Sequence, residues 1–119
     1  MTASECVALA STSGSTFQRA VNVFIDGFRE ADRQEKLNLV AAPIEASGPM
    51  EGLVAAVVSA LCREAGLEAP GWTDQVHSPE PFFAFPARSL ALRLRLMIES
   101  PPAFRVRNVF VPENYLQRA

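Results

Sequence analysis

The chain has 119 residues, of which 49% are hydrophobic and 20% are charged, and its formal net charge is −2. This length and composition fit one globular domain with its own core, and they exclude a largely disordered, collagen-like or low-complexity chain. The charge is uneven, because residues 1–80 carry five basic and eleven acidic side chains, whereas residues 81–119 carry six arginines and two glutamates.

Residues 1–14 are rich in Ser, Thr and Ala, and we expect a loose arm or a short helical turn there. A helix then opens at Ser15, where Ser15 and Gln18 have the spacing of a capping box. Gly27 lies inside this helix and is expected to permit close approach of another helix. The helical spacing of one apolar face defines the segment, through Phe17, Ala20, Val21, Phe24, Ile25 and Phe28.

A second short helix is predicted over residues 33–42, after a capping box at Asp32 and Glu35. Its inward side chains would be Leu37, Val40 and Ala41, and Pro43 ends it. The alternative is that this segment continues the preceding helix with a bend.

The third helix, over residues 49–65, has the strongest pattern and is predicted to be central. Gly48 and Pro49 are typical of a helix start, and Gly66 of a helix end. The helix is apolar almost all round, with a stripe formed by Met50, Leu53, Val54, Val57, Val58, Leu61, Cys62 and Ala65.

Residues 67–86 form a long irregular stretch in which four prolines, including Pro86, exclude regular structure. Aromatic residues gather here, so we expect a packed segment or a binding surface. Specifically, Trp72 is expected to be buried, whereas at least one of Phe82, Phe83 and Phe85 should be exposed and bordered by Arg88.

Residues 87–99 fit both strand-like alternation and helical spacing through Leu90, Leu94, Met97 and Ile98. The residue types favour a helix. Residues 103–111 are left as either a strand or a short helix followed by an extended piece. Pro112 can start a last turn that docks through Tyr115 and Leu116.

The two cysteines suggest a chain kept in a reducing compartment. Cys62 belongs to the apolar stripe of the third helix, whereas Cys6 would be an incidental thiol in the N-terminal arm. No apolar run approaches the ~20 residues of a membrane span. The first ten residues also lack the basic start of a secretory signal. We therefore expect a cytoplasmic protein.

Residues suited to catalysis or metal binding are sparse. His77 is the single histidine and stands in a proline-flanked loop, where an exposed side chain is expected. Two distant cysteines and one histidine do not supply the ligands of a zinc site, and no phosphate-binding loop is present. Neighbouring carboxylates such as Glu64 and Glu68 fit a solvated face. We expect no enzyme, no metal and no cofactor.

The arginine-rich C-terminal third admits three interpretations. Its arginines could pair with the acidic helices of the same molecule, bind a protein partner, or bind nucleic acid. The negative net charge disfavours nucleic acid. The internal pairing is the default expectation. The arginines concerned are Arg88, Arg93, Arg95, Arg105, Arg107 and Arg118.

Four motifs occur in order between residues 50 and 116: Leu-Glu-Ala-Pro-Gly-Trp-Thr at 67–73, Phe-Phe-Ala-Phe-Pro at 82–86, Glu-Ser-Pro-Pro-Ala-Phe-Arg at 99–105 and Arg-Asn-Val-Phe-Val at 107–111. Their order resembles a group of small, mostly uncharacterised bacterial proteins with a Ser-Pro-x-x-Phe-Arg-x-Arg-Asn-Ile-Phe-Ile ending. Members often follow a helix-turn-helix segment or are encoded beside a nucleotidyltransferase-like toxin. The resemblance implies an antitoxin-like or accessory role. This chain differs in lacking a clear DNA-binding segment before residue 50.

Together these patterns predict a single all-α domain over residues 1–119, with about five helices and a long Pro/Phe-rich connecting segment. The predicted function is a non-enzymatic protein-interaction module that binds a protein partner, such as a toxin or a second copy, and no membrane. The alternatives are a nucleic-acid-binding regulator and a small-molecule-binding helical protein. The candidate partner-binding residues are Phe82, Phe83, Phe85, Arg88, Arg93, Arg95, Arg105 and Arg107.

Overall fold

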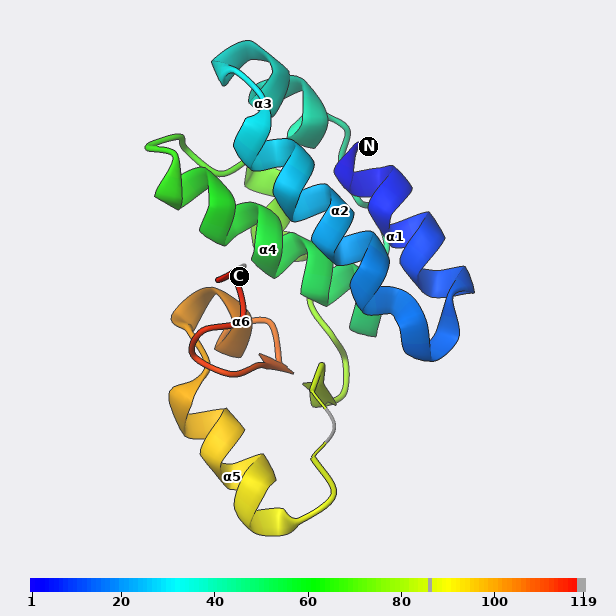
Figure 1. Ribbon diagram of the computed structural model, residues 1–119, viewed down its shortest axis with the longest axis vertical. Coiled ribbons are helices and arrows are strands. Elements are labelled where there is room, and N and C mark those ends of the chain that lie inside the picture. The colour runs from blue at the N-terminus through cyan, green and yellow to red at the C-terminus, as the bar shows by residue number, and fades with distance from the viewer. Residues whose placement is uncertain (86, 118–119) are drawn as a thin grey trace.

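The computed structural model describes residues 1–85 and 87–117 and confirms the all-α class (Figure 1). Pro86 and Arg118 lie outside the described residues. Within this range the molecule measures 42 × 27 × 27 Å. In chain order its helices and strands are α1 (Ala3–Thr12), the 3-10 helix η1 (Gly14–Thr16), α2 (Phe17–Glu30), α3 (Arg33–Ala41), α4 (Pro49–Glu64), the 3-10 helix η2 (Gly71–Gln75), β1 (Phe82–Phe83), α5 (Leu90–Glu99), α6 (Pro102–Arg105) and β2 (Val109–Phe110).

Helix α4 is the centre of the fold, as its sequence predicts. Nine of its sixteen residues are buried, and α1, α2 and α6 pack against it. The helix starts at Pro49 after an N-cap at Gly48. At its end Gly66 has a φ of 71°, and the Leu67 N–H donates to the Cys62 carbonyl. This left-handed turn is the Schellman motif that glycine favours.

Helix α2 presents the predicted apolar face to the core but begins differently at its N-terminus. It starts at Phe17, its N-cap is Thr16, and no side chain caps it. The predicted capping box of Ser15 and Gln18 is therefore not formed. The Gln18 side chain instead makes hydrogen bonds with Asn22 and Tyr115. Gly27 is exposed and a Cβ there would meet nothing within 4 Å. The expectation that it permits close approach of a helix is also wrong.

The N-terminal arm expected over residues 1–14 is instead the helix α1. Thr2 and Glu5 form a capping box, because the Thr2 hydroxyl accepts from the Glu5 N–H and the Glu5 carboxylate accepts from the Thr2 N–H. Ala3, Cys6 and Ala10 are buried on one face, and the helix packs against α2 and α4. These side chains are small, so the apolar face is hard to recognise in the sequence. Their small size nevertheless lets α1 pack closely against the other helices. Cys6 is accordingly a core residue.

Helix α3 follows its predicted N-cap, since the Asp32 carboxylate accepts from the Glu35 N–H. Only part of its predicted inward face is covered. Val40 is buried, whereas Leu37 and Ala41 are exposed. The prediction for those two side chains is wrong because this short helix meets the core with its last turn alone.

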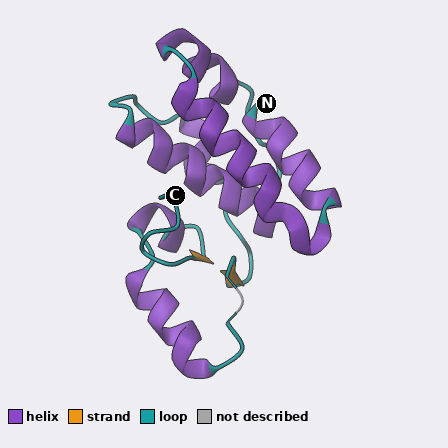
Figure 2. Cartoon of the chain, viewed as in Figure 1, coloured by secondary structure: helices purple, strands orange, loops and turns teal. Residues whose placement is uncertain are grey.

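The C-terminal part combines a short parallel sheet with two helices (Figure 2). Residues 103–111 follow the second of the two expected alternatives, because the end of α6 is followed by an extended piece that contains β2. Strand β1 pairs with β2 in parallel, with Phe82 opposite Val109. The expectation that residues 67–86 contain no regular structure is therefore wrong, because η2 and β1 occupy the stretches between the prolines. The sheet lies between the helical bundle and α5, which extends at the opposite end of the molecule from α3 (Figure 1).

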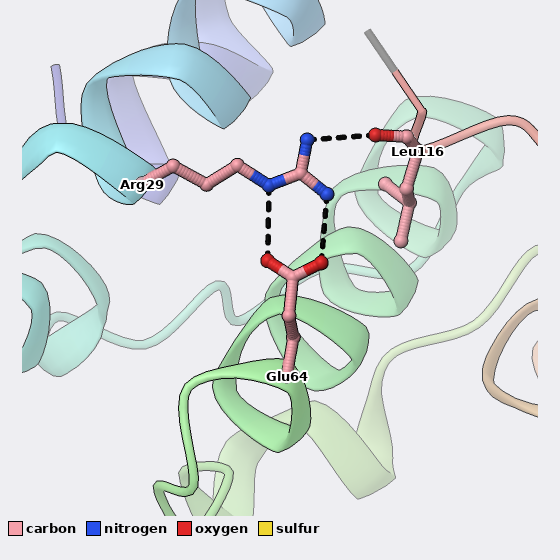
Figure 3. Close-up of polar contacts among 3 residues, drawn as sticks. All are labelled: Arg29, Glu64 and Leu116. Carbon is pink, nitrogen blue, oxygen red and sulfur yellow. Dashed lines mark hydrogen bonds and ion pairs between the residues drawn. The ribbon is translucent and has the colours of Figure 1, made fainter.

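An ion pair joins α2, α4 and the C-terminal segment (Figure 3). Arg29 donates from Nε and Nη2 to the two carboxylate oxygens of Glu64, at 2.9 and 2.8 Å. Its Nη1 donates to the Leu116 carbonyl at 2.7 Å. One arginine therefore holds the last described turn against the bundle. The acidic Glu64 is paired from within the N-terminal half, rather than by an arginine of the C-terminal third.

Candidate protein-interaction surface

Helix α5 carries an apolar stripe that faces solvent. Leu90, Leu94, Met97 and Ile98 occupy positions i, i+4, i+7 and i+8, which lie on one face of a helix. Their side chains are 72%, 50%, 40% and 78% exposed. Leu96 is the one buried residue of this helix. We call these four residues the α5 stripe.

The opposite side of α5 is held by a small core of its own. Leu96 packs with Ala87 and Phe110, and the partly buried Phe83 and Leu92 complete the cluster. This satellite core is separate from the main cluster around α4. The two faces of α5 therefore differ in kind, since one is buried within the molecule and the other is apolar and uncovered.

Hydrogen bonds fix both ends of α5. The Ser89 hydroxyl accepts from the Leu92 N–H at 3.1 Å and caps the N-terminus. At the C-terminus the Ser100 hydroxyl donates to the Leu96 carbonyl and accepts from the Val111 N–H, at 2.6 and 2.8 Å. The α5 stripe is consequently presented on a helix that is capped at its N-terminus and bonded to the segment of β2 at its C-terminus.

Arg93 and Arg95 border the α5 stripe on its two sides, because successive helical residues are turned by about 100°. The Arg93 Nε donates to the Ala87 carbonyl at 2.8 Å, and its guanidinium lies 5.5 Å from the centre of the Phe83 ring. Arg95 forms an exposed ion pair with Glu99 at 3.1 Å. Each border of the stripe thus carries an arginine, and the charge of Arg95 is partly offset by Glu99.

The other arginines predicted to bind a partner are Arg88, Arg105 and Arg107, and they differ in exposure. Arg107 is buried, with its guanidinium donating to the carbonyls of Thr73 and Ala103 and lying 3.7 Å from Asp74. Burial lowers the pKa of Arg107. Its guanidinium is thus engaged inside the molecule, so Arg107 does not belong to the exposed surface around α5. Arg88 and Arg105 are exposed, and neither has an ion pair with another described residue.

The aromatic segment folds back on the protein more than it faces outward. Phe82 is half-buried against Phe17, and Phe83 is half-buried against Phe110, with ring centres 5.8 and 5.2 Å apart. Phe85 is 49% exposed, in agreement with the expected exposed phenylalanine. Trp72 is half-buried rather than fully buried, and its indole N–H donates to the Val40 carbonyl at 2.9 Å.

Sequence reasoning did not include the α5 stripe among the candidate residues. The i, i+4, i+7, i+8 spacing was the available signal, and the helix that the residue types favour over residues 87–99 is confirmed as α5, Leu90–Glu99. Spacing identifies which side chains share a face, but it does not say whether the protein itself covers that face.

The acidic, cysteine and histidine side chains of the described residues are dispersed. No group of three or more His, Cys, Asp or Glu side chains in this part of the chain could hold a metal ion. His77 is exposed, and Glu64 is engaged by Arg29. Among the helices described, none is both long and apolar enough to cross a membrane.

The chain has no detected relative from which a function could be inferred, so the proposal below is based on the surface of α5. No protein-family model, curated protein or solved structure matches the chain. The likeness in motif order over residues 50–116 stays a prediction.

Proposed function

We propose that the chain is a non-enzymatic protein-interaction module that binds an amphipathic helix of a partner through the α5 stripe. The observation that carries the proposal is the uncovered apolar face of Leu90, Leu94, Met97 and Ile98 on a helix with one buried residue. Contiguous apolar surface on a small protein is typical of an interaction site. Side chains at this spacing are also the anchors by which amphipathic helices bind apolar surfaces.

The charges at the edges of the stripe favour a partner with acidic borders. When two helices pack along their apolar stripes, the residues that flank one stripe face those that flank the other. Arg93 and Arg95 would therefore lie opposite the flanking residues of the partner. Aspartate or glutamate at those positions would pair with them, and arginine is suited to forked contacts with carboxylates.

The same charges disfavour pairing of α5 with a second copy of itself. In a parallel pair Arg93 would face Arg95 of the other copy, and in an antiparallel pair each arginine would face its own equivalent. Glu99 offsets the Arg95 charge only in part, because their ion pair is exposed to solvent, and Arg93 has no ion pair with a described residue. A different protein with an acidic amphipathic helix is the better fit, and an antitoxin-like or accessory factor would use such a surface to cover its partner.

The experiment uses synthetic helical peptides with leucines along one face, measured by fluorescence anisotropy against the full chain. One peptide carries glutamates beside the leucines, and a matched peptide carries lysines. We expect the glutamate peptide to bind more tightly. Arg95→Glu should weaken the glutamate peptide about tenfold and strengthen the lysine peptide. The Leu90→Gln/Ile98→Gln variant should lose both.

The matched control is Val23→Gln, since Val23 is a 56% exposed apolar residue of α2 that stands apart from the stripe. It should bind as the unmodified chain does. Equal binding of the two peptides, or binding that survives Leu90→Gln/Ile98→Gln, would contradict the proposal. Concentration-dependent dimerisation abolished by the same double substitution would assign the stripe to a second copy, and binding to anionic vesicles alone would assign it to a membrane surface.

Nucleic acid is the second candidate that the arginines raise. Two features disfavour it: Arg107 is buried, and Arg93 and Arg95 lie on opposite sides of the α5 stripe. We expect no binding to mixed-sequence DNA or RNA. Suppose instead that the chain retards DNA or RNA in a gel mobility-shift assay, and that this retardation disappears with rising salt and in the Arg93→Ala/Arg95→Ala variant. That result would favour the nucleic-acid-binding regulator.

A further inference from the structure

A hollow lies apart from the α5 stripe, between the start of α2, the end of β1 with the residues after it, and the C-terminal turn. Its volume is about 530 Å³, within the usual size range of small-molecule sites. Four aromatic side chains contribute to its walls, namely Phe17, Phe83, Phe85 and Tyr115. None of the described residues that line it is Asp, Glu, Lys, Arg or His.

The polar groups of this hollow form a directed chain. The Tyr115 hydroxyl donates to Gln18 Oε1 at 2.6 Å, and Gln18 Nε2 donates to Asn22 Oδ1 at 3.0 Å. Burial raises the pKa of Tyr115, so its hydroxyl keeps the proton that it donates. The chain of donors ends at Asn22 Oδ1.

Asn22 is left with hydrogen-bonding capacity at the hollow. A carboxamide has two N–H donors and an oxygen with two lone pairs. Gln18 uses one lone pair, and the Asn22 N–H groups donate to no other described residue. Asn22 therefore offers a donor and an acceptor side by side, next to aromatic walls.

We propose that this hollow binds an uncharged, flat heteroaromatic compound whose edge carries an acceptor next to a donor, the chemistry of a nucleobase. The aromatic walls supply ring stacking, which is tolerant of the identity of the ring. The Asn22 carboxamide pairs with the edge of the ring in the two-bond manner that asparagine uses with bases. The uncharged lining disfavours a ligand with a phosphate group, because the described lining residues supply no cation to pair with it.

The site is independent of the proposed protein-binding stripe, because no residue of the stripe lines the hollow. Phe83 is nevertheless shared between the hollow and the satellite core beneath α5. We therefore choose Phe85 and Asn22 for substitution and leave Phe83 in place. Phe85 is half-exposed, so its truncation should leave the fold intact.

The test is a titration of the full chain with adenosine and with uridine, followed by the NMR signals of the Asn22 side-chain N–H groups. We expect these signals to shift and to saturate. Asn22→Ala and Phe85→Ala should each weaken binding about tenfold, as measured by calorimetry or by other shifted amides. Val23→Ala, on the same helix but outside the hollow, should bind as the unmodified chain does.

Two further kinds of compound test the uncharged lining and the aromatic walls separately. The corresponding 5′-monophosphates should bind more weakly than the nucleosides, because the hollow has no cationic residue among its described lining. Cyclohexanecarboxamide, which has the amide edge without an aromatic ring, should not bind. Absence of any Asn22 shift at millimolar nucleoside, or affinity that Phe85→Ala and Asn22→Ala leave unchanged, would overturn the proposal.

Discussion

Gly27 and Gly52 both lie inside helices, but their surroundings are opposite. A Cβ added at Gly52 would lie 2.7 Å from the Ser78 backbone nitrogen and 2.9 Å from the His77 carbonyl carbon. A Cβ at Gly27 would meet nothing within 4 Å. Gly52 is therefore required because α4 closely approaches the backbone of residues 77–78, whereas Gly27 only weakens the helix that contains it.

We predict opposite effects of alanine at these two positions. Gly27→Ala should raise the free energy of unfolding by up to about 1 kcal/mol, because alanine is the better helix former. Gly52→Ala should lower it by about 1–3 kcal/mol, because the new methyl group overpacks the contact with residues 77–78. Chemical denaturation of the two variants measures both values. Stabilisation by Gly52→Ala would show that the approach of α4 to this segment is looser than described.

The ion pair of Arg29 and Glu64 gives a prediction about pH. The hydrogen bonds from Arg29 lower the pKa of Glu64 in the folded chain. The pair therefore stabilises the fold above the unfolded pKa of glutamate, about 4.3, and this contribution is lost as the pH falls through the folded pKa. Because the Glu64 side chain is 52% exposed, we expect less than about 1 kcal/mol.

Glu64→Gln should therefore lower the free energy of unfolding at pH 7 and have a smaller effect at pH 3. Urea denaturation at several pH values measures the difference between the two chains. Glu68→Gln is the matched control, since Glu68 is exposed and has no ion pair among the described residues. A difference that is constant with pH would mean that the substitution acts through packing and not through the charge.

At the scale of elements, α1 and α4 show what a sequence pattern reveals. Large apolar residues at four successive turns identify α4, because the driving force for its burial is visible in the side chains themselves. The buried face of α1 consists of Ala3, Cys6 and Ala10, whose small size hides the pattern. The Thr2–Glu5 capping box was the missed signal, and its spacing is recognisable in the sequence.

Burial makes Cys6 a probe of the attachment of α1. Desolvation raises the pKa of Cys6 to about 12, so its reactive thiolate is scarce while the helix is docked. Thr2→Ala removes the cap and should cost about 0.5–2 kcal/mol of helix stability. We predict faster alkylation of Cys6 in this variant at pH 8, measured by mass spectrometry. The rate at Cys62, buried in α4, should not change; equal acceleration at both thiols would indicate global unfolding instead.

At the scale of the whole molecule, two cores of unequal size share one chain. The main cluster joins α1, α2, α3, α4, α6 and β2, whereas the satellite cluster consists of Ala87, Leu96 and Phe110 with two partly buried neighbours. This division explains why the candidate surface could not be predicted from the sequence. The spacing of Leu90, Leu94, Met97 and Ile98 is equally consistent with a core-facing stripe, and only the tertiary arrangement leaves it uncovered.

The unequal cores predict unequal stability along the chain. Regions with few buried contacts open at lower free energy than the main core, so the amides of Leu94 to Glu99 in α5 should exchange with deuterium faster than the amides of Val54 to Leu61 in α4. Leu96→Ala should accelerate exchange in α5 further, because it removes the one buried side chain of that helix, while exchange in α4 stays unchanged. Native-state hydrogen exchange with mass spectrometry measures both segments in one experiment.

Binding of the glutamate peptide should have the opposite effect to Leu96→Ala. It should slow exchange in α5 and leave exchange in α4 unchanged, since the bound partner covers the α5 stripe and stabilises that helix. If Leu96→Ala accelerated both helices equally, the molecule would be one cooperative unit and α5 would depend on the bundle for its order.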